Sequence, residues 1–260
     1  MKLGFYISLI IDDKTFYETI HEIKNKKIYN SIEFFYPEDK KIRIKHLKRF
    51  IYAKENLSYI YDYSMHLPFQ KVNIGSKNSN LRRYSINLIK DAIKYASKVN
   101  VKTLTLHMGL IEKSNKESLK LNILAIKEIL KEVKKYNMIL CIENLCIDNS
   151  LTKKGKDLLN IIDIINDDNL KVTLDIGHIA LTSKDIISEI ELLKKYINHI
   201  HIHNNDLKND LHLNLNNGLI DIPSIIKKLK EINYKNTILV ETGYIKEDYI
   251  DNYNYLISII

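Results

Sequence analysis

Histidines and carboxylates gather in the segment INHIHIHNNDLKNDLHL, which holds four of the nine histidines. His199, His201 and His203 alternate with isoleucines, and Asp210 and His212 follow within a short loop. Successive residues of a β-strand face opposite sides, so the three histidines share one face and the isoleucines share the other. Imidazoles and carboxylates are the ligands expected for Zn, Mn or Co, so a metal site is the first chemistry that this segment indicates.

The same pattern of an inward imidazole or carboxylate recurs near the ends of five other strand-like runs. These five residues are His66, His107, Glu143, Asp175 and Glu241. Buried charges cost roughly several kcal/mol each unless they are paired or bound to a metal, so one shared metal centre is the simplest explanation. His199 and His201 lie deeper than His203. For these two we favour a hydrogen-bonded polar ladder, in which His201 can support a ligand from behind.

The runs that carry these residues recur about every 30 residues and have the composition of buried strands. They cover residues 3–10, 31–36, 59–66, 101–107, 138–145, 171–177, 197–203 and 237–243. Helical periodicity lies between them and is clearest over 82–99 and 117–136. Strands alternating with helices predict an α/β fold, a single (β/α)8 TIM barrel over 1–260, with its active site where the strands end. His21 and His46 fall in helical stretches far from that rim and are predicted to be surface residues.

The composition limits the class of protein. The chain has 260 residues, of which 45% are hydrophobic and 28% charged, so a sizeable core is expected. No apolar run reaches the ~18 residues of a membrane span, so no membrane partner is expected. Cys141 and Cys146 show neither disulfide nor zinc spacing, and the first residues lack a signal-peptide cleavage site, which together predict a cytoplasmic protein. The net charge of +8 suits a polyanion such as DNA, although the lysines are spread along helical faces.

The chain resembles the xylose isomerase-like TIM-barrel superfamily, which includes sugar and sugar-phosphate isomerases and epimerases and also endonuclease IV. The resemblance is carried, in order, by HLPFQKVNIGS, LTLHMG, CIENL, LDIGH, HIHNND, DLHLNLNNGLID and VETG. In the isomerases it implies one divalent metal held by Glu143, Asp175, His203 and Glu241. It also implies that Glu143 and Glu241 are the catalytic acid–base pair and that His178 binds substrate oxygens. The implied reaction is proton transfer next to a carbonyl of a small sugar or sugar phosphate.

The resemblance to endonuclease IV implies a different centre, in which three zinc ions cleave the phosphodiester at an abasic site in DNA. Its ligand positions match nine residues here: His66, His107, Glu143, Asp175, His178, His203, Asp210, His212 and Glu241. The chain departs from that enzyme in its DIGH motif, in Leu207 where a serine is usual, and in a shorter loop between His203 and Asp210. Phe69 stands where the nuclease has a tyrosine that enters the duplex.

Three hypotheses remain open. A metal-dependent isomerase or epimerase accounts for the DIGH motif and the short loop, with Phe69 and Glu33 as further candidates for binding substrate. An endonuclease IV-like zinc phosphodiesterase accounts for all nine ligands and for the positive charge. A barrel that has lost catalysis and only binds a ligand is the third, and the retention of Glu143 and Glu241 argues against it. We expect one to three divalent ions (Zn, Mn or Co) per chain, and the apolar helix faces are compatible with a homodimer.

Overall fold

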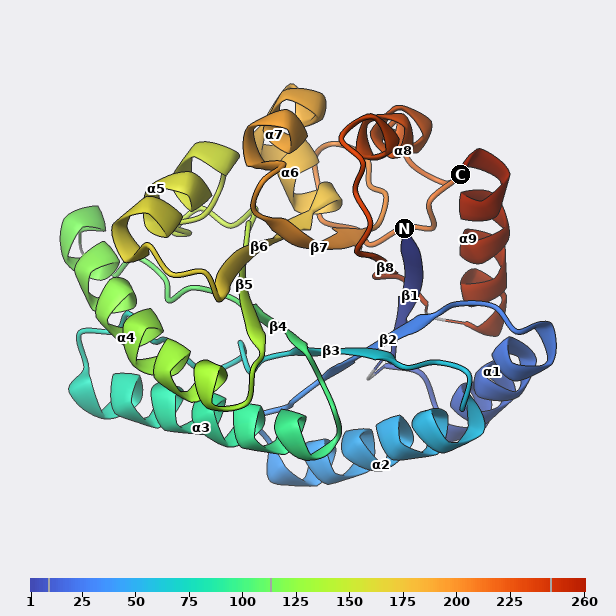
Figure 1. Cartoon of the computed structure of the whole chain (residues 1–260), viewed down its shortest axis with the longest axis horizontal. Coiled ribbons are helices and arrows are strands. Elements are labelled where there is room, and N and C mark those ends of the chain that lie inside the picture. The colour runs from blue at the N-terminus through green and yellow to red at the C-terminus, as the bar shows by residue number, and fades with distance from the viewer. Residues whose placement is uncertain (9, 113, 244) are drawn as a thin grey trace.

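Eight parallel strands close into a barrel in sequential order, and the helices lie outside it (Figure 1). The computed structural model describes residues 1–8, 10–112, 114–243 and 245–260. The strands are β1 (Lys2–Tyr6), β2 (Ser31–Phe35), β3 (Asp62–His66), β4 (Thr103–Leu106), β5 (Ile139–Glu143), β6 (Leu170–Asp175), β7 (Ile197–Ile202) and β8 (Thr237–Val240). The helices in the described residues are α1 (Asp13–Lys26), α2 (Lys40–Asn56), α3 (Ser79–Lys98), α4 (Asn115–Lys135), α5 (Gly155–Ile165), α6 (Ile176–Thr182), α7 (Ile186–Leu193), α8 (Ile222–Glu231) and α9 (Lys246–Ile259). The predicted (β/α)8 barrel is confirmed.

The apolar core lies between the strands and the surrounding helices. Leu104, Leu174 and Ile200, which alternate with polar residues along their strands, are fully buried on the helix side. Ile89 and Ile93 on α3 are buried in the same core, at the spacing that places residues on one helical face. This arrangement leaves the other face of each strand to point into the barrel, where the polar residues lie. No helix in the described part of the chain is long and apolar enough to cross a membrane.

All the strands except β3, which ends at His66 as predicted, end earlier than the sequence pattern predicted. β1 ends at Tyr6 rather than at residue 10, because its ladder with β2 ends at the Tyr6–Glu33 pair. Position 9 of that predicted strand lies outside the described residues. β8 ends at Val240 in the same way, and Glu241 follows it at the rim. After the last hydrogen bond of each strand, the chain enters a βα loop. The candidate ligands therefore lie at the strand ends or just after them.

His46 is buried, and the prediction that it lies on the surface is wrong. It is 1% exposed, and its Nε2 accepts a hydrogen bond of 3.1 Å from the backbone N–H of Phe35. Burial, assisted by Arg49, lowers the pKa of His46 to about 3, so the ring stays neutral and can accept this bond. The many lysines and arginines of α2 weaken its apolar periodicity, so the sequence did not reveal which face of the helix packs on β2. His21 on α1 is exposed, as expected.

Candidate metal centre

All nine predicted ligands lie on the face of the barrel where the strands end. Parallel strands of a closed barrel end on the same side, so residues far apart in the sequence meet there. Their side chains fall into three groups whose ligand atoms lie within 4.8 Å of one another in each group. The groups are His66, His107 and Glu143; Glu143, Asp175 and Glu241 together with His201; and His178, His203, Asp210 and His212.

The first group joins the ends of β3, β4 and β5. His107 Nε2 lies 2.7 Å from Glu143 Oε2, and His66 Nε2 lies 3.4 Å from the same oxygen. The two Nε2 atoms of His66 and His107 are 3.2 Å apart. His66 donates its Nδ1–H to the carbonyl of Leu67 over 2.9 Å, so Nε2 is the nitrogen that offers a lone pair when the ring is neutral. Two imidazole nitrogens and one carboxylate therefore converge on a common point.

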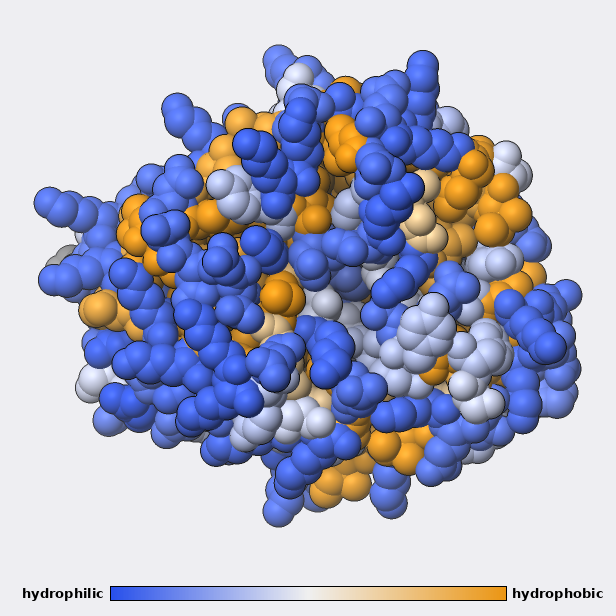
Figure 2. Space-filling model, viewed as in Figure 1, coloured by the Kyte–Doolittle hydropathy of each residue, from blue (hydrophilic) through white to orange (hydrophobic). Residues whose placement is uncertain are grey.

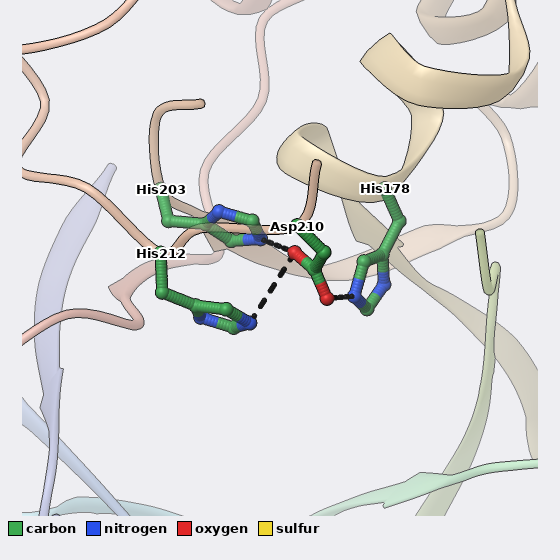
Figure 3. Close-up of side chains that lie close together, drawn as sticks. All are labelled: His178, His203, Asp210 and His212. Carbon is green, nitrogen blue, oxygen red and sulfur yellow. Dashed lines mark hydrogen bonds and ion pairs between the residues drawn. The ribbon is translucent and has the colours of Figure 1, made fainter. Parts of the chain in front are cut away.

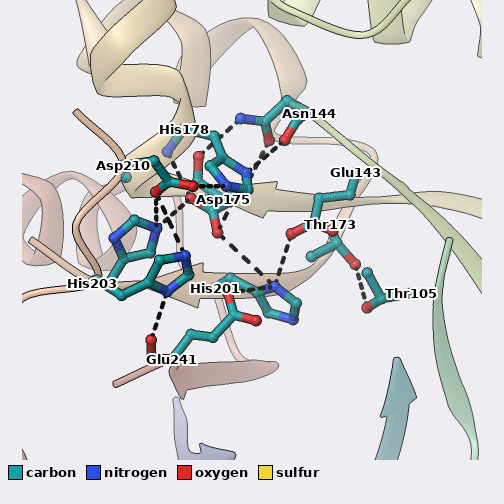
Figure 4. Close-up of polar contacts among 12 residues, drawn as sticks. Thr105, Glu143, Asn144, Thr173, Asp175, His178, His201, His203, Asp210 and Glu241 are labelled. Atoms are coloured by element: carbon teal, nitrogen blue, oxygen red, sulfur yellow. Dashed lines mark hydrogen bonds and ion pairs between the residues drawn. The ribbon is translucent and has the colours of Figure 1, made fainter. Parts of the chain in front are cut away.

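The second group is centred on carboxylates at the ends of β5, β6 and β8 (Figure 4). His201 lies among them: its Nδ1 is 2.8 Å from Glu143 Oε1 and 3.3 Å from Glu241 Oε2. The same nitrogen is 4.0 Å from Asp175 Oδ2. His201 is fully buried, and so is the Asp175 side chain. The contacts of His201 agree with the predicted supporting position behind the ligands.

The third group surrounds Asp210, which comes from the loop between β7 and α8 (Figure 3). His178 Nε2 lies 3.3 Å from Asp210 Oδ2, and His212 Nε2 lies 3.5 Å from Oδ1. His203 Nε2 is 3.6 Å from Asp210 Oδ1 and 3.2 Å from Asp175 Oδ1, so His203 connects this group to the second one. The rings of His203 and His212 stack with centroids 3.9 Å apart.

Several ligand atoms of these groups are buried without hydrogen-bond partners, which is consistent with a cation as their partner. Glu143 Oε2, Asp175 Oδ2 and both ring nitrogens of His203 are buried without a hydrogen bond of acceptable geometry in the described structure. His178 and His212 donate Nδ1–H to the carbonyls of Asn144 and Glu241 over 3.0 and 2.8 Å. Such anchoring of the other ring nitrogen is what metal-binding histidines need. The buried histidine and carboxylate groups are consistent with divalent metal sites.

The charges of the site are balanced by protons on its histidines when no cation is bound. Burial favours neutral Glu143, but the neighbouring His201 and His107 outweigh it and hold the pKa of Glu143 well below its usual range. Burial also opposes charge on His212, but its bond to Asp210 outweighs this and raises the pKa of His212 to about 9. The same competition lowers the pKa of Asp210, through His178 and His212. A cation entering the site would therefore displace protons.

Several residues that the sequence analysis missed hold the ligands in place. Asn144 bonds both backbone groups of Asp175: its Nδ2 donates to the carbonyl over 2.9 Å, and its Oδ1 accepts from the N–H over 2.8 Å. Asp175 Oδ1 also caps α6 by accepting from the N–H of His178 over 2.7 Å. At Gly177 a Cβ atom would lie 1.9 Å from His203 Cε1, so only glycine leaves room for that ring. The signal was present, since Asn144 and Gly177 adjoin Glu143 and His178 in the CIENL and DIGH motifs.

A cavity of about 280 Å³ opens beside the centre. It is lined by Tyr6, Ser8, Ile10, Phe69, His212, Glu241, Thr242 and Gly243. Phe69 is 38% exposed, and its ring packs against the rings of His66 and His107 with centroids 4.9 and 4.7 Å away. The uncharged residues Tyr6, Ser8 and Thr242 carried no sequence signal that could have identified them.

The three predicted substrate-binding residues lie at different depths. Phe69 lies in the wall of the cavity, whereas His178 belongs to the third ligand group. Glu33 is fully buried beneath the centre, where its carboxylate lies 3.0 Å from both His199 Nε2 and His201 Nε2. Its role in binding substrate stays a prediction, and it is not among the residues that line the cavity.

Sequence comparison matches most of the chain to one family and to archaeal relatives. The family described as "Xylose isomerase-like TIM barrel" matches residues 25–258. Uncharacterized protein MJ1311 of Methanocaldococcus jannaschii is 30% identical over 70% of this chain and 65% of that protein. Uncharacterized protein MJ1614 of the same organism is 30% identical over 68% of this chain and 69% of that protein. The chain spans about two thirds of the length of these relatives.

Solved structures share the fold over nearly the whole chain. A D-tagatose 3-epimerase-like protein superposes with a TM-score of 0.86 at 27% identity, covering 100% of this chain and 97% of the other. A D-psicose 3-epimerase determined in the presence of D-fructose gives 0.78 at 17% identity, covering 99% and 98%. The IolI protein with a bound zinc atom gives 0.80 at 16% identity, covering 100% and 98%. At their low identity, the last two show a common fold alone.

Proposed function

The chain belongs to the xylose isomerase-like TIM barrel family, and we propose that it is a divalent-metal-dependent isomerase or epimerase of a small sugar or sugar phosphate. One observation carries the proposal: Glu143 and Glu241 offer carboxylate oxygens within 4.8 Å of each other and of Asp175. Glu241 also lines the 280 Å³ cavity, a size suited to a small substrate. The likeness to the D-tagatose 3-epimerase-like protein supports this choice of reaction.

The proposed reaction divides the work between the two glutamates. A divalent cation, when held by Glu143, Asp175, His203 and Glu241, supplies polarisation of the substrate carbonyl. One glutamate removes the proton from the neighbouring carbon, and the other returns a proton to the opposite face. Phe69, beside the cavity, excludes water and offers an apolar surface to the sugar carbons. We assign to His178 the bonding of substrate oxygens, as the family resemblance implies.

The test is turnover of ketoses in D₂O by protein loaded with Mn²⁺, Co²⁺ or Zn²⁺. D-Fructose, D-psicose, D-tagatose and their phosphates are the probes, and deuterium incorporated next to the carbonyl is the readout. Glu143→Gln and Glu241→Gln each remove a group that transfers protons, so we expect each to lower the rate by roughly 10²–10⁴-fold. Glu247→Gln, at an exposed glutamate that belongs to none of the ligand groups, is the matched control. Normal turnover by either of the first two variants would rule out proton transfer by these carboxylates.

A second candidate, a zinc phosphodiesterase that cuts DNA at abasic sites, is favoured by the grouping of the ligands. A one-metal centre has no evident need for His66, His107, Asp210 and His212, yet each lies in a ligand group, and Glu143 is shared between two groups. Three cations could then activate a water and neutralise a phosphate. Incubation of zinc-loaded protein with duplex DNA that carries one abasic site decides between the two functions. Cleavage that is lost in both His107→Gln and His212→Gln would favour the phosphodiesterase.

A further inference from the structure

A fourth group of possible ligands lies below the rim, inside the barrel. It consists of Glu33 on β2 and of His199 and His201 on β7. Their exposed fractions are 0%, 2% and 0%. Glu33 Oε2 lies 3.0 Å from His199 Nε2, and Glu33 Oε1 lies 3.0 Å from His201 Nε2. One carboxylate and two imidazoles therefore face one another in a part of the barrel that the proposed reaction does not use.

The contact between Glu33 and His201 lacks a hydrogen bond of acceptable geometry, although the two atoms are 3.0 Å apart. His199 and Glu33 Oε2 form a hydrogen bond, but Glu33 Oε1 and His201 Nε2 have no partner of acceptable geometry in the described structure. A buried polar atom left without a partner costs about 1–3 kcal/mol, and more when it is charged. Glu143 Oε2, Asp175 Oδ2 and the His203 nitrogens show the same deficit in the centre above. A cation bound between Glu33 Oε1 and His201 Nε2 would supply the partner that both atoms lack.

We propose that Glu33, His199 and His201 bind a divalent transition-metal cation, with Zn²⁺ as the best fit, at a site separate from the centre at the rim. The two imidazoles and the carboxylate supply the nitrogen and oxygen ligands that zinc accepts. Ligands bonded at about 2.0–2.1 Å in a tetrahedron lie roughly 3.3–3.4 Å apart, so the observed 3.0 Å distances require only a small expansion.

The surroundings of His201 fit a ligand that binds through Nε2. Its Nδ1 lies 2.8 Å from Glu143 Oε1, so the ring donates its other N–H to a carboxylate. A neutral ring is then sufficient, because Nε2 binds the cation and Nδ1 alone donates. The cation also offsets the charge of Glu33, which is buried with Glu143 and Asp175 in the same interior. A cation held there links β2 to β7 across the barrel. We therefore expect it to stabilise the folded barrel.

A polar cavity at the opposite face of the barrel, where the strands begin, reaches His199. It has a volume of about 150 Å³, and its lining includes His199, Asn198, Asp62, Lys2 and Lys102, of which Lys2 is paired with Asp62. Figure 2 shows this face, and hydrophilic and weakly polar residues occupy its middle. One water takes up about 30 Å³, so the cavity has room for an entering cation and for a water as the remaining ligand. Entry here does not require passage through the centre at the rim.

The direct test is anomalous scattering at the zinc edge from crystals of the unaltered protein grown with zinc. The proposal predicts a peak bounded by the Glu33 carboxylate, His199 Nε2 and His201 Nε2. The absence of a peak there overturns the proposal, whether or not the centre at the rim contains zinc, and leaves a hydrogen-bonded ladder as the account of these residues. Occupancy at Glu143 and Asp175 is read from the same map, so failure of the proposed function is distinguished from failure of this site.

Metal counting in solution provides a second test. His199→Gln removes a ligand of the lower site alone, and we expect one fewer zinc per chain by elemental analysis. Glu33→Gln should give the same loss, and either variant suffices if the other does not fold. His21→Gln, at an exposed histidine on α1, is the matched control and should keep the full count. An unchanged count in folded His199→Gln or Glu33→Gln overturns the proposal.

Discussion

At the scale of single residues, the centre is built from histidines whose tautomers are fixed by the backbone. His66, His178 and His212 each donate Nδ1–H to a carbonyl and so direct Nε2 toward the carboxylates. The alternation of polar and apolar residues in the sequence was enough to find these side chains, because strand geometry decides which face they share. The carbonyls that anchor them could not be predicted, since they depend on how each loop leaves its strand.

Zinc affinity should increase with pH up to about pH 9. The pKa of His212 is raised to about 9, because its bond to Asp210 outweighs the effect of burial. Below that pH the metal-free ring carries a proton that a cation must displace, so protons compete with zinc and the affinity falls on acidification. Competition with a chelator from pH 6.5 to 9.5 measures this dependence. His212→Gln should give a shallower dependence, and an affinity that does not change with pH in the wild type would contradict the assignment.

At the scale of elements, the βα turns position the ligands as much as the strands do. Asp175 ends β6 and caps α6, and Gly177 in the first turn of α6 lies against the ring of His203. This turn explains the DIGH motif in physical terms: the aspartate caps the helix, the glycine leaves room, and His178 reaches Asp210.

Gly177→Ala should displace His203 without removing any ligand. The added Cβ would lie 1.9 Å from His203 Cε1, and a ring held between Asp175 and His212 cannot move away without losing its place. We expect zinc affinity to fall by at least tenfold, measured by the same chelator competition. Gly155→Ala is the control, because its nearest contact is the flexible end of Glu189. Equal affinities in the two variants would show that the turn does not set the position of His203.

The sequence predicted the elements well but their ends less well. Alternation located all eight strands, yet β1 ends at Tyr6 because the ladder, rather than hydropathy, decides where a strand stops. His46 was misplaced because the face of α2 that packs on the sheet contains polar residues. The nine candidate ligands stood out in the sequence because they are histidines and carboxylates at or near the ends of predicted strands. Ser8 and Thr242 in the cavity wall were missed because serine and threonine are common residue types that do not by themselves indicate a binding site.

At the scale of the whole molecule, the closed barrel holds several buried carboxylates in one interior. Glu33, Glu143 and Asp175 are each at most 1% exposed. Strands from all around the barrel contribute to the site, so the centre cannot form until the sheet has closed. Cation binding and global stability should therefore be linked.

Removal of metal should lower the melting temperature of the protein. A cation that binds only the folded chain at 100 times its Kd stabilises it by about 2.7 kcal/mol. For a chain of this size, each kcal/mol corresponds to roughly 2–4 °C, so a shift of roughly 5–10 °C is expected. Calorimetry of chelator-treated protein before and after addition of zinc measures the shift. Magnesium, which binds imidazole poorly, is the control cation. Identical melting curves with and without zinc would contradict the linkage.

The central claim is a divalent metal centre built on Glu143, Asp175, His203 and Glu241, and metal content per chain tests it most directly. Wild-type protein purified without added metal and its Asp175→Asn variant are compared by elemental analysis. Asparagine keeps an oxygen that can cap α6, so the variant should fold while losing a charged ligand. We predict at least one Zn, Mn or Co per wild-type chain and a lower content in the variant. Wild-type protein that contains no stoichiometric metal and takes up none at pH 8 would contradict the account.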